Sequence, residues 1–165
     1  MIRAATINDA NKIVEIYNYY ISHTTISFEE TLVDEKEIIS RMQTIFQLNL
    51  PWLVYENEQG EIIGFAYANK WKARSAYRFT VEVSVYLKEN CAEKGIGTLL
   101  YQQLFSILKQ ADYKNVIAII ALPNAASIAL HEKFGLNKVA HFKEVGFKFN
   151  QWIDVGYWQG LLKTN

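Results

Sequence analysis

The sequence has 165 residues, 50% of them hydrophobic and 14% aromatic, which favours a single folded domain over residues 1–165 and excludes a disordered chain. Its 17 basic residues balance its 17 acidic ones, so we expect no nucleic-acid partner. The single cysteine cannot form an intramolecular disulfide, and no Cys/His cluster has zinc-site spacing, so we expect no metal. Without a signal-peptide pattern or an apolar run long enough to span a bilayer, the chain is expected to be soluble, cytoplasmic and free of membrane contact.

The first half of the chain is expected to form a strand, two helices and a pair of hairpin strands. Thr6 and Asp9 resemble a capping box, in which a hydroxyl and an acid three residues later satisfy the free N–H groups of a first helical turn. Helical spacing of apolar residues predicts a second helix, and the turn signal Asn-Glu-Gln-Gly separates the two hairpin strands. The predicted elements are a strand over Ile2–Ala5, a helix including Ile13 and Tyr20, a helix over Asp34–Gln47, and strands over Leu53–Glu56 and Ile62–Ala68.

The second half of the chain mixes strands with single helices. Thr80–Leu87 has strong β-propensity, and the β-branched run Val116–Leu122 is typical of a strand buried on both sides. A helix is predicted from Gly95 to about Lys109, and its apolar face consists of Ile96, Leu99, Leu100, Leu104, Ile107 and Leu108. The remaining predicted elements are a helix over Ala125–Phe134 that Gly135 closes, and two aromatic-rich strands within His141–Leu162 that meet near Asn150. This order predicts an α+β (mixed α/β) fold in which the Gly95 helix joins two parallel strands.

A glycine-containing segment, Glu93–Thr98, separates the strand ending at Leu87 from the helix after it. Glycines at such a junction let backbone N–H groups approach a phosphate, and the helix dipole favours an anion there. A Walker loop would need Gly-Lys-Ser/Thr, and a dinucleotide fingerprint would need a third glycine where Leu100 stands. Two glycines before a helix are also ordinary turn chemistry, so the segment alone indicates either a phosphate site or a turn.

Val83–Leu87 followed by Ala92-x-x-Gly-x-Gly97 resembles the central motif of the GNAT N-acetyltransferase superfamily, although that family usually has Arg or Gln where Ala92 stands. The resemblance implies a GNAT fold: a central mixed, largely antiparallel sheet flanked by helices, with a parallel strand pair at the cofactor site. It also implies acetyl-CoA as co-substrate. The cofactor-binding residues that it implies are Ser84, Val85, Tyr86, Glu93, Lys94, Gly95, Ile96, Gly97, Thr98, Asn124 and Ser127. Asn124 is equally suited to cap the helix that follows it.

A second resemblance covers nearly the whole chain. The segments 51–54, 71–77, 80–82 and 152–159 are similar to the phosphinothricin acetyltransferase family, which acetylates the α-amino group of phosphinothricin and whose relatives act on methionine sulfoximine or methionine sulfone. This resemblance implies direct transfer, in a ternary complex, to the α-amino group of a small amino acid or analogue. It also implies a homodimer, for which Trp152–Trp158 is a candidate interface segment, although aromatic core strands would explain it equally.

Two residues are candidates for catalysis. An α-ammonium group must lose a proton before it attacks a thioester, and the resemblance assigns this role to Glu82, whose position inside a predicted strand is unusual for a carboxylate. A solvent-facing strand position is the alternative. Many GNAT enzymes have Tyr at the position of His131, so the resemblance implies that His131 donates a proton or organises the site. A partly exposed helical His is the other interpretation, and Tyr101 is a second candidate acid that we expect on its helix surface.

The acceptor side is expected to involve Lys72, Arg74, Tyr77 and Phe28. A guanidinium fork suits a substrate carboxylate or phosphinate, although an ordinary charged loop would look the same. Two further functions remain open: a GNAT enzyme for another primary amine (a polyamine, an aminoglycoside or a protein N-terminus), and a non-catalytic acyl-CoA-binding module. Lys72 and Arg74 favour an anionic acceptor, and Glu82 with His131 favours catalysis.

Overall fold

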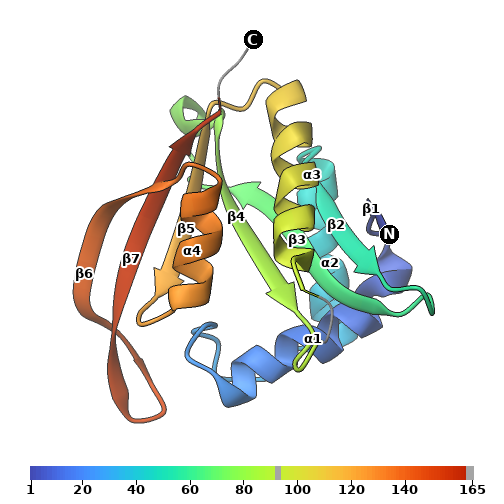
Figure 1. The fold of residues 1–165 in the computed structure, drawn as a ribbon, viewed down its shortest axis with the longest axis horizontal. Coiled ribbons are helices and arrows are strands. Elements are labelled where there is room, and N and C mark those ends of the chain that lie inside the picture. The colour runs from blue at the N-terminus through green and yellow to red at the C-terminus, as the bar shows by residue number, and fades with distance from the viewer. Residues whose placement is uncertain (92–93, 163–165) are drawn as a thin grey trace.

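The predicted strands form one seven-stranded sheet in the order β1-β2-β3-β4-β5-β7-β6, in a computed structural model that describes residues 1–91 and 94–162 (Figure 1). Neighbouring strands are antiparallel except β4 and β5, which are parallel. The strands are β1 Ile2–Ala4, β2 Trp52–Glu56, β3 Ile62–Lys70, β4 Thr80–Leu87, β5 Asn115–Ala121, β6 Asn137–Lys148 and β7 Gln151–Leu161. The α+β class with a parallel pair in the middle of a mixed sheet is therefore confirmed.

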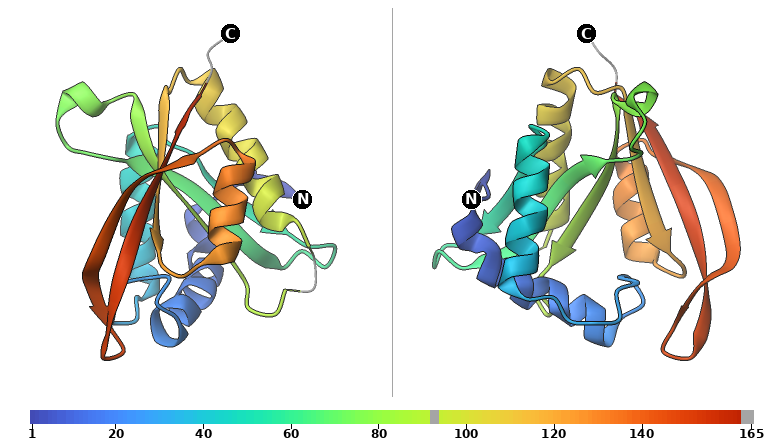
Figure 2. Two further views of the ribbon diagram at one scale, coloured as in Figure 1. Left: turned by 60° about the vertical axis from the view of Figure 1, so that its left-hand side comes forward. Right: turned by 180° about the vertical axis from the view of Figure 1, so that it is seen from behind.

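Helices cover both faces of this sheet (Figures 1 and 2). They are α1 Ala10–His23, α2 Glu35–Gln47, α3 Ile96–Gln110 and α4 Ala125–Lys133. Helices α1 and α2 pack together on one face, while α3 and α4 lie on the other. The parallel pair needs a crossover connection, and α3 supplies it on the face that α4 shares.

Local sequence signals set most helix ends. The Asp34 carboxylate accepts a hydrogen bond from the Glu37 N–H at 2.8 Å and begins α2. The Asp9 carboxylate accepts from the Thr6 N–H at 2.7 Å, but a 3-10 turn over Ile7–Asp9 precedes α1. At the end of α4, Gly135 has φ 79° and its N–H donates to Glu132, while the next N–H donates to His131. This is a Schellman motif, and it confirms Gly135 as the residue that closes the helix.

Three expectations about exposure and length are corrected. Ile119 in β5 is 40% exposed, so the Val116–Leu122 run is not buried on both sides, because β4 diverges from β5 at this level. Leu99 is 44% exposed and Tyr101 is fully buried. Helix α4 packs beside α3, so the buried face of α3 includes Tyr101 and excludes Leu99. Strand β6 begins at Asn137 rather than near His141, because the outer positions of an edge strand carry no hydrophobic signal.

The β6–β7 hairpin turns through Phe149 and Asn150, whose φ values of 50° and 58° suit a two-residue hairpin turn. This confirms the predicted meeting point of the last two strands. Trp158 of β7 is 2% exposed and belongs to the core, whereas Trp152 is 65% exposed. The aromatic segment at the C-terminal end therefore combines core and surface residues.

Candidate active site

The site begins where the two parallel strands separate. Strands β4 and β5 pair over Thr80–Glu82, and their last register pair is Glu82 with Ile117. Strand β5 continues alongside β7 as far as Ala121. Beyond Glu82 the two strands diverge (Figure 1). Two adjoining cavities lie along the opening. Both cavities are lined by Ile26, Ser84, Tyr86, Ile119 and Ala121.

The backbone of β4 offers a hydrogen-bond donor to this opening. The Lys88 N–H donates to the Ile63 carbonyl at 2.8 Å, and the β3–β4 register continues from there without a shift. Since antiparallel pairs alternate between hydrogen-bonded and non-hydrogen-bonded, Leu87 and Val85 direct their N–H and C=O groups away from β3. The Tyr20 hydroxyl bonds both backbone groups of Leu87, at 3.2 and 2.7 Å, in agreement with this direction. The Val85 N–H therefore points into the opening between β4 and β5.

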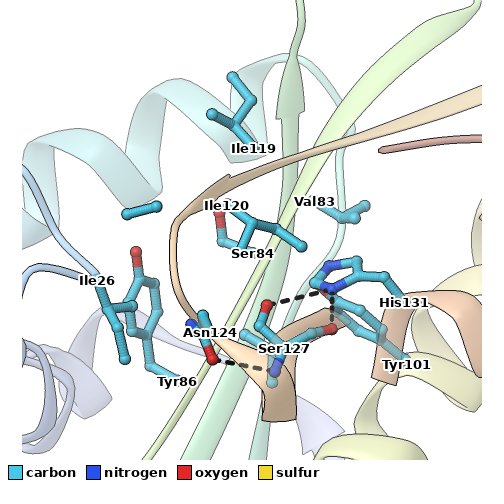
Figure 3. A pocket seen from close by; sticks show the side chains of 12 residues that line it. Ile26, Val83, Ser84, Tyr86, Tyr101, Ile119, Ile120, Asn124, Ser127 and His131 are labelled. Atoms are coloured by element: carbon cyan, nitrogen blue, oxygen red, sulfur yellow. Dashed lines mark hydrogen bonds between the residues drawn. The ribbon is translucent and has the colours of Figure 1, made fainter. Parts of the chain in front are cut away.

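The first cavity, of about 50 Å³, lies between β4, β5 and the helices α3 and α4 (Figure 3). Asn124 and Ser127 line it, and the Asn124 side chain also accepts from the Ser127 N–H at 3.1 Å. The predicted cap of α4 is thus confirmed, and the same residue faces the cavity. His131 and Tyr101 close the inner side of the cavity.

His131 is 4% exposed and both of its ring nitrogens have partners. Nδ1 lies 2.7 Å from the Ser127 carbonyl oxygen, which can only accept, so the hydrogen-bond network assigns the ring proton to Nδ1. Nε2 then accepts from the Tyr101 hydroxyl at 2.9 Å. Burial lowers the pKa of His131, which favours the neutral ring, and burial raises the pKa of Tyr101, which keeps its proton at neutral pH. The expectation that Tyr101 is a surface residue is wrong.

Helix α3 begins at Ile96, and residues 94–98 are not among those that line the first cavity. Gly95 is its N-cap, with φ 86°, a left-handed conformation that favours glycine. A Cβ at Gly97 would lie 3.3 Å from Leu130 Cδ2, so this glycine allows α3 to approach α4 closely. Thr98 accepts from Lys133 Nζ at 3.4 Å, Lys94 is exposed, and Ile96 is buried in the core. Glu93, together with Ala92, lies outside the described residues.

Glu82 lines the second cavity, which has a volume of about 450 Å³. Burial raises the pKa of this carboxyl above its usual range, and the nearby charge of Lys72 opposes the shift. A carboxylate whose pKa is raised binds a proton more strongly, and this suits it to accept one from an ammonium group. The structure thus places Glu82 half-buried in the wall of this cavity, neither within the core nor fully exposed.

The predicted acceptor residues are divided between the cavity and a neighbouring loop. Phe28 lines the cavity. Lys72 lies over the Trp71 ring, with Nζ 5.2 Å from the ring centroid, and Tyr77 packs edge-on against the same ring at 5.2 Å. Arg74 precedes the 3-10 turn that Tyr77 ends. The structure therefore brings Phe28 to Glu82, but Lys72, Arg74 and Tyr77 are not among the residues that line the cavity.

Other cavity residues had no distinguishing signal in the sequence. The Tyr17 hydroxyl donates to Glu29 Oε1 at 2.8 Å and lies 3.1 Å from the Ser27 hydroxyl. Burial by itself would raise the pKa of Glu29, but hydrogen bonds from Arg41 and Tyr17 lower it. These residues come from α1, α2 and the segment between them, and Tyr17 fits the pattern of an ordinary core residue. Only the fold brings this second carboxylate into the cavity that contains Glu82.

Residues 1–91 and 94–162 contain neither a group of metal ligands nor a membrane-spanning helix. Within those ranges no three His, Cys, Asp or Glu side chains gather in a way that could hold a metal ion. Within the same ranges no helix has the length and apolar character needed to cross a bilayer.

Comparison with known proteins identifies the relatives of the chain. It is 39% identical to the phosphinothricin N-acetyltransferase of Streptomyces viridochromogenes over 96% of this chain and 85% of the relative. It is 34% identical to an L-methionine sulfoximine/L-methionine sulfone acetyltransferase of Pseudomonas aeruginosa, over 96% and 92%. A GNAT superfamily phosphinothricin acetyltransferase from Sinorhizobium meliloti, solved in complex with AcCoA, superimposes with TM-score 0.95 at 35% identity, covering 98% of this chain and 88% of that one.

A family model for the acetyltransferase (GNAT) domain matches residues 2–156, which include both cavities and their lining residues. The fold agrees with this match, because the parallel strands β4 and β5 diverge after Glu82 and α3, whose N-cap is Gly95, connects them. The chain therefore belongs to the GNAT acetyltransferase family.

Proposed function

We propose that this protein transfers the acetyl group of acetyl-CoA directly to the α-amino group of a small amino acid or analogue such as phosphinothricin, methionine sulfoximine or methionine sulfone. The observation that carries the proposal is the position of Glu82 in a 450 Å³ cavity that adjoins the cavity of His131 through the opening between β4 and β5. A base and a cofactor channel on the two sides of one opening suit a ternary complex. The names of the relatives support the acceptor class.

In the proposed reaction acetyl-CoA supplies the thioester carbonyl. Glu82 accepts a proton from the acceptor ammonium, directly or through one water, and the free amine attacks the carbonyl carbon. The Val85 N–H, which points into the opening, is suited to donate a hydrogen bond to the oxyanion that develops. The N-terminus of α3, with Gly95 as its N-cap, is suited to hold the pyrophosphate.

The leaving thiolate needs a group that carries a proton at neutral pH. Neutral His131 has its proton on Nδ1, bound to the Ser127 carbonyl, and Nε2 has none to give. The Tyr101 hydroxyl retains its proton and lines the same cavity. We therefore assign proton donation to Tyr101 in this proposal: its O–H turns from His131 Nε2 to the departing sulfur as the C–S bond breaks, and the tyrosine regains a proton from solvent while Glu82 releases one. His131 holds the hydroxyl in place before this step.

The acceptor's acidic group would bind at the mouth of the second cavity, beside the loop of Lys72, Arg74 and Tyr77. The positive charge of Lys72 favours the ionised form of Glu82 and would likewise attract an acidic group of the acceptor. A cytoplasmic location and a homodimer also belong to this proposal. The β6–β7 hairpin supports the dimer, because it exposes the apolar side chains Val139, Phe142, Val145, Phe147 and Trp152.

The test is an assay of thiol release from acetyl-CoA with a panel of acceptors. Phosphinothricin, methionine sulfoximine, methionine sulfone and common amino acids should include the best substrates, and polyamines, aminoglycosides and peptides with a free N-terminus should be poorer. Better turnover of a cationic amine would replace the proposed acceptor class. Measured binding of acetyl-CoA with no turnover of any amine would make the protein a binding module and refute the catalytic proposal.

A further inference from the structure

The segment between α1 and α2 forms one wall of the acceptor cavity, yet it contains no helix or strand. Ile26, Ser27, Phe28 and Glu29 all line that cavity. The backbone of this segment must be held at a fixed distance from Glu82 if the acceptor amine is to be placed accurately, because small displacements of reacting groups reduce rates strongly. Helices α1 and α2 contact this segment through Tyr17 and Arg41, and a further set of contacts comes from the other end of the chain, at the β6–β7 hairpin (Figure 2).

Lys148, the last residue of β6, supplies two of these contacts. Its side chain is buried, with 2% of the residue exposed, and Nζ donates to the Thr24 carbonyl at 2.8 Å and to the Ser27 carbonyl at 2.6 Å. Burying an ammonium group is costly unless it is hydrogen-bonded, and these carbonyls accept two of its three N–H donors while Nζ lies 4.9 Å from the centroid of the Phe149 ring. The Lys148 ammonium therefore joins β6 to the beginning and the middle of the cavity wall.

Gly146, two residues earlier on β6, contacts the same wall. A Cβ at this position would lie 2.4 Å from Phe28 Cε2 and 2.5 Å from Phe28 Cζ, so the ring rests directly on the strand backbone. Glycine in a strand often marks such a close approach. The Phe28 ring lines the cavity, and β6 blocks its movement on one side. Lys148 also holds the carbonyl of Ser27, the residue before Phe28, which fixes the backbone from which the ring extends.

The contacts continue from the wall to the second carboxylate. Ser27, whose carbonyl binds Lys148, uses its hydroxyl to contact Tyr17 at 3.1 Å and to accept from the Glu29 N–H at 3.2 Å. Displacing Ser27 would therefore displace Phe28, Glu29 and the Tyr17 hydroxyl together. Of the wall residues only Ile26 also lines the first cavity, where His131 and Asn124 are found, whereas Ser27, Phe28 and Glu29 line the second cavity alone.

We propose that the end of β6 positions the acceptor-binding wall. Lys148 is the positioning residue that holds the backbone of the wall, and Gly146 leaves room for the Phe28 ring to lie against β6. This part of the chain therefore controls recognition of the acceptor and not of acetyl-CoA. The proposal rests on the proposed function, because it uses the assignment of the Glu82 cavity to the acceptor. It adds a determinant of acceptor specificity that does not itself contact the reacting atoms.

Lys148→Met tests the proposal, because Met keeps an unbranched side chain and removes the ammonium group. We expect the KM for the best acceptor to rise about tenfold or more, since a shift of an ångström in a positioning group can cost that much, while the KM for acetyl-CoA stays within about twofold. The matched control is Lys143→Met, an exposed lysine on the same strand, which should change neither value. An unchanged acceptor KM in folded Lys148→Met, or an equal rise in both KM values, would overturn the positioning role.

Gly146→Ala gives an independent test that retains Lys148. The added methyl group displaces the Phe28 ring. We therefore expect the KM for the acceptor to rise while the KM for acetyl-CoA stays unchanged. If Lys148→Met fails to fold, this variant decides the matter, and an unchanged acceptor KM overturns the proposal. In a Phe28→Ala background the effect of Lys148→Met should shrink, because the ring that it positions is gone; full additivity would contradict the mechanism.

Hydrogen exchange separates this inference from the proposed function. Backbone amides of residues 24–33 should exchange faster in Lys148→Met than in the natural protein or in Lys143→Met, with or without an acceptor. Unchanged exchange would refute positioning even in an active enzyme. Faster exchange in a protein that turns over none of the panel would instead leave Lys148 as the anchor of this wall and refute the proposed acceptor class.

Discussion

At the scale of single residues, the acceptor cavity contains two carboxylates in opposite environments. Burial raises the pKa of Glu82, whereas hydrogen bonds from Arg41 and Tyr17 outweigh burial and lower the pKa of Glu29. Environments that separate two carboxyl pKa values in this way commonly separate their roles. Glu82 is the carboxylate suited to accept and release a proton, while Glu29 stays ionised and holds the Tyr17 hydroxyl.

Glu82→Gln should lower kcat by about 100-fold or more, the contribution typical of a general base, with little change in the KM for acetyl-CoA. The base must be ionised, so activity should fall as the pH drops through the raised pKa of Glu82, at a higher pH than an ordinary carboxyl would give. This acidic limb should disappear from the residual activity of the variant. Initial rates measured across the pH range would check both points.

Glu58→Gln is the matched control for this change, because Glu58 is exposed in the turn between β2 and β3. It should leave the rate and its pH dependence unchanged. If Glu82→Gln reacts as fast as the natural protein, or if its pH profile keeps the acidic limb, Glu82 is not the base.

At the scale of elements, α3 and α4 act as a pair. Gly97 lets α3 approach Leu130 of α4, and the hydrogen bond from Tyr101 to His131 joins the two helices at the wall of the first cavity. Both helices are needed for this contact, because α3 supplies Tyr101 and α4 supplies His131. The buried Tyr101–His131 contact therefore couples the packing of the helices to the proposed delivery of a proton.

Tyr101→Phe should reduce kcat by about 10- to 100-fold with a nearly unchanged KM for acetyl-CoA, because it removes the proposed proton donor while keeping the ring in place. It should also destabilise the protein by about 1–3 kcal/mol, since His131 Nε2 is left without its donor. Steady-state kinetics and denaturant unfolding measure the two effects.

Tyr113→Phe, just beyond the end of α3, is the control and should behave like the natural protein in the assay. If Tyr101→Phe loses stability but keeps its full kcat, the Tyr101–His131 contact is structural and the proton must come from elsewhere.

At the scale of the whole molecule, the β6–β7 hairpin has two environments. Trp158 lies in the core and donates from its indole N–H to Glu132 at 3.2 Å, while Trp152 is exposed and packs only on its hairpin neighbour Phe147 among the described ring contacts. Exposed apolar side chains on a hairpin that projects from the sheet (Figure 1) suit the proposed contact between two copies.

Trp152→Glu should convert the proposed dimer to a monomer, because a buried and unpaired charge in an apolar interface costs several kcal/mol. Sedimentation of the natural protein and the variant at equal concentration measures the change. Ile7→Glu, at an exposed position before α1, is the control and should keep the natural oligomeric state. A monomeric natural protein, or a variant that remains a dimer, would contradict this interface.

How far the sequence predicted the molecule depends on how local each signal is. Gly135, Asp34 and Asn124 act on neighbouring residues, so their helix ends follow from the sequence directly. The motif around Gly95 and the strand containing Glu82 are also continuous in sequence, which is why the family and the fold class could be predicted and Glu82 could be proposed as the base. The position of Tyr101 could not, because its burial depends on α4, which lies about one strand and one turn further along the chain.

The sequence by itself therefore determined the elements, their order, the family and the principal candidates for catalysis, because those depend on propensity, periodicity and continuous motifs. Only the tertiary structure decided that β4 and β5 separate after Glu82, that Ile119 faces a cavity, and that Glu29 enters the same cavity. It also decided that Lys148 holds a wall built from Thr24 and Ser27. The two Lys148 contacts join residues more than a hundred positions apart, and no local pattern in the sequence encodes a contact at that separation.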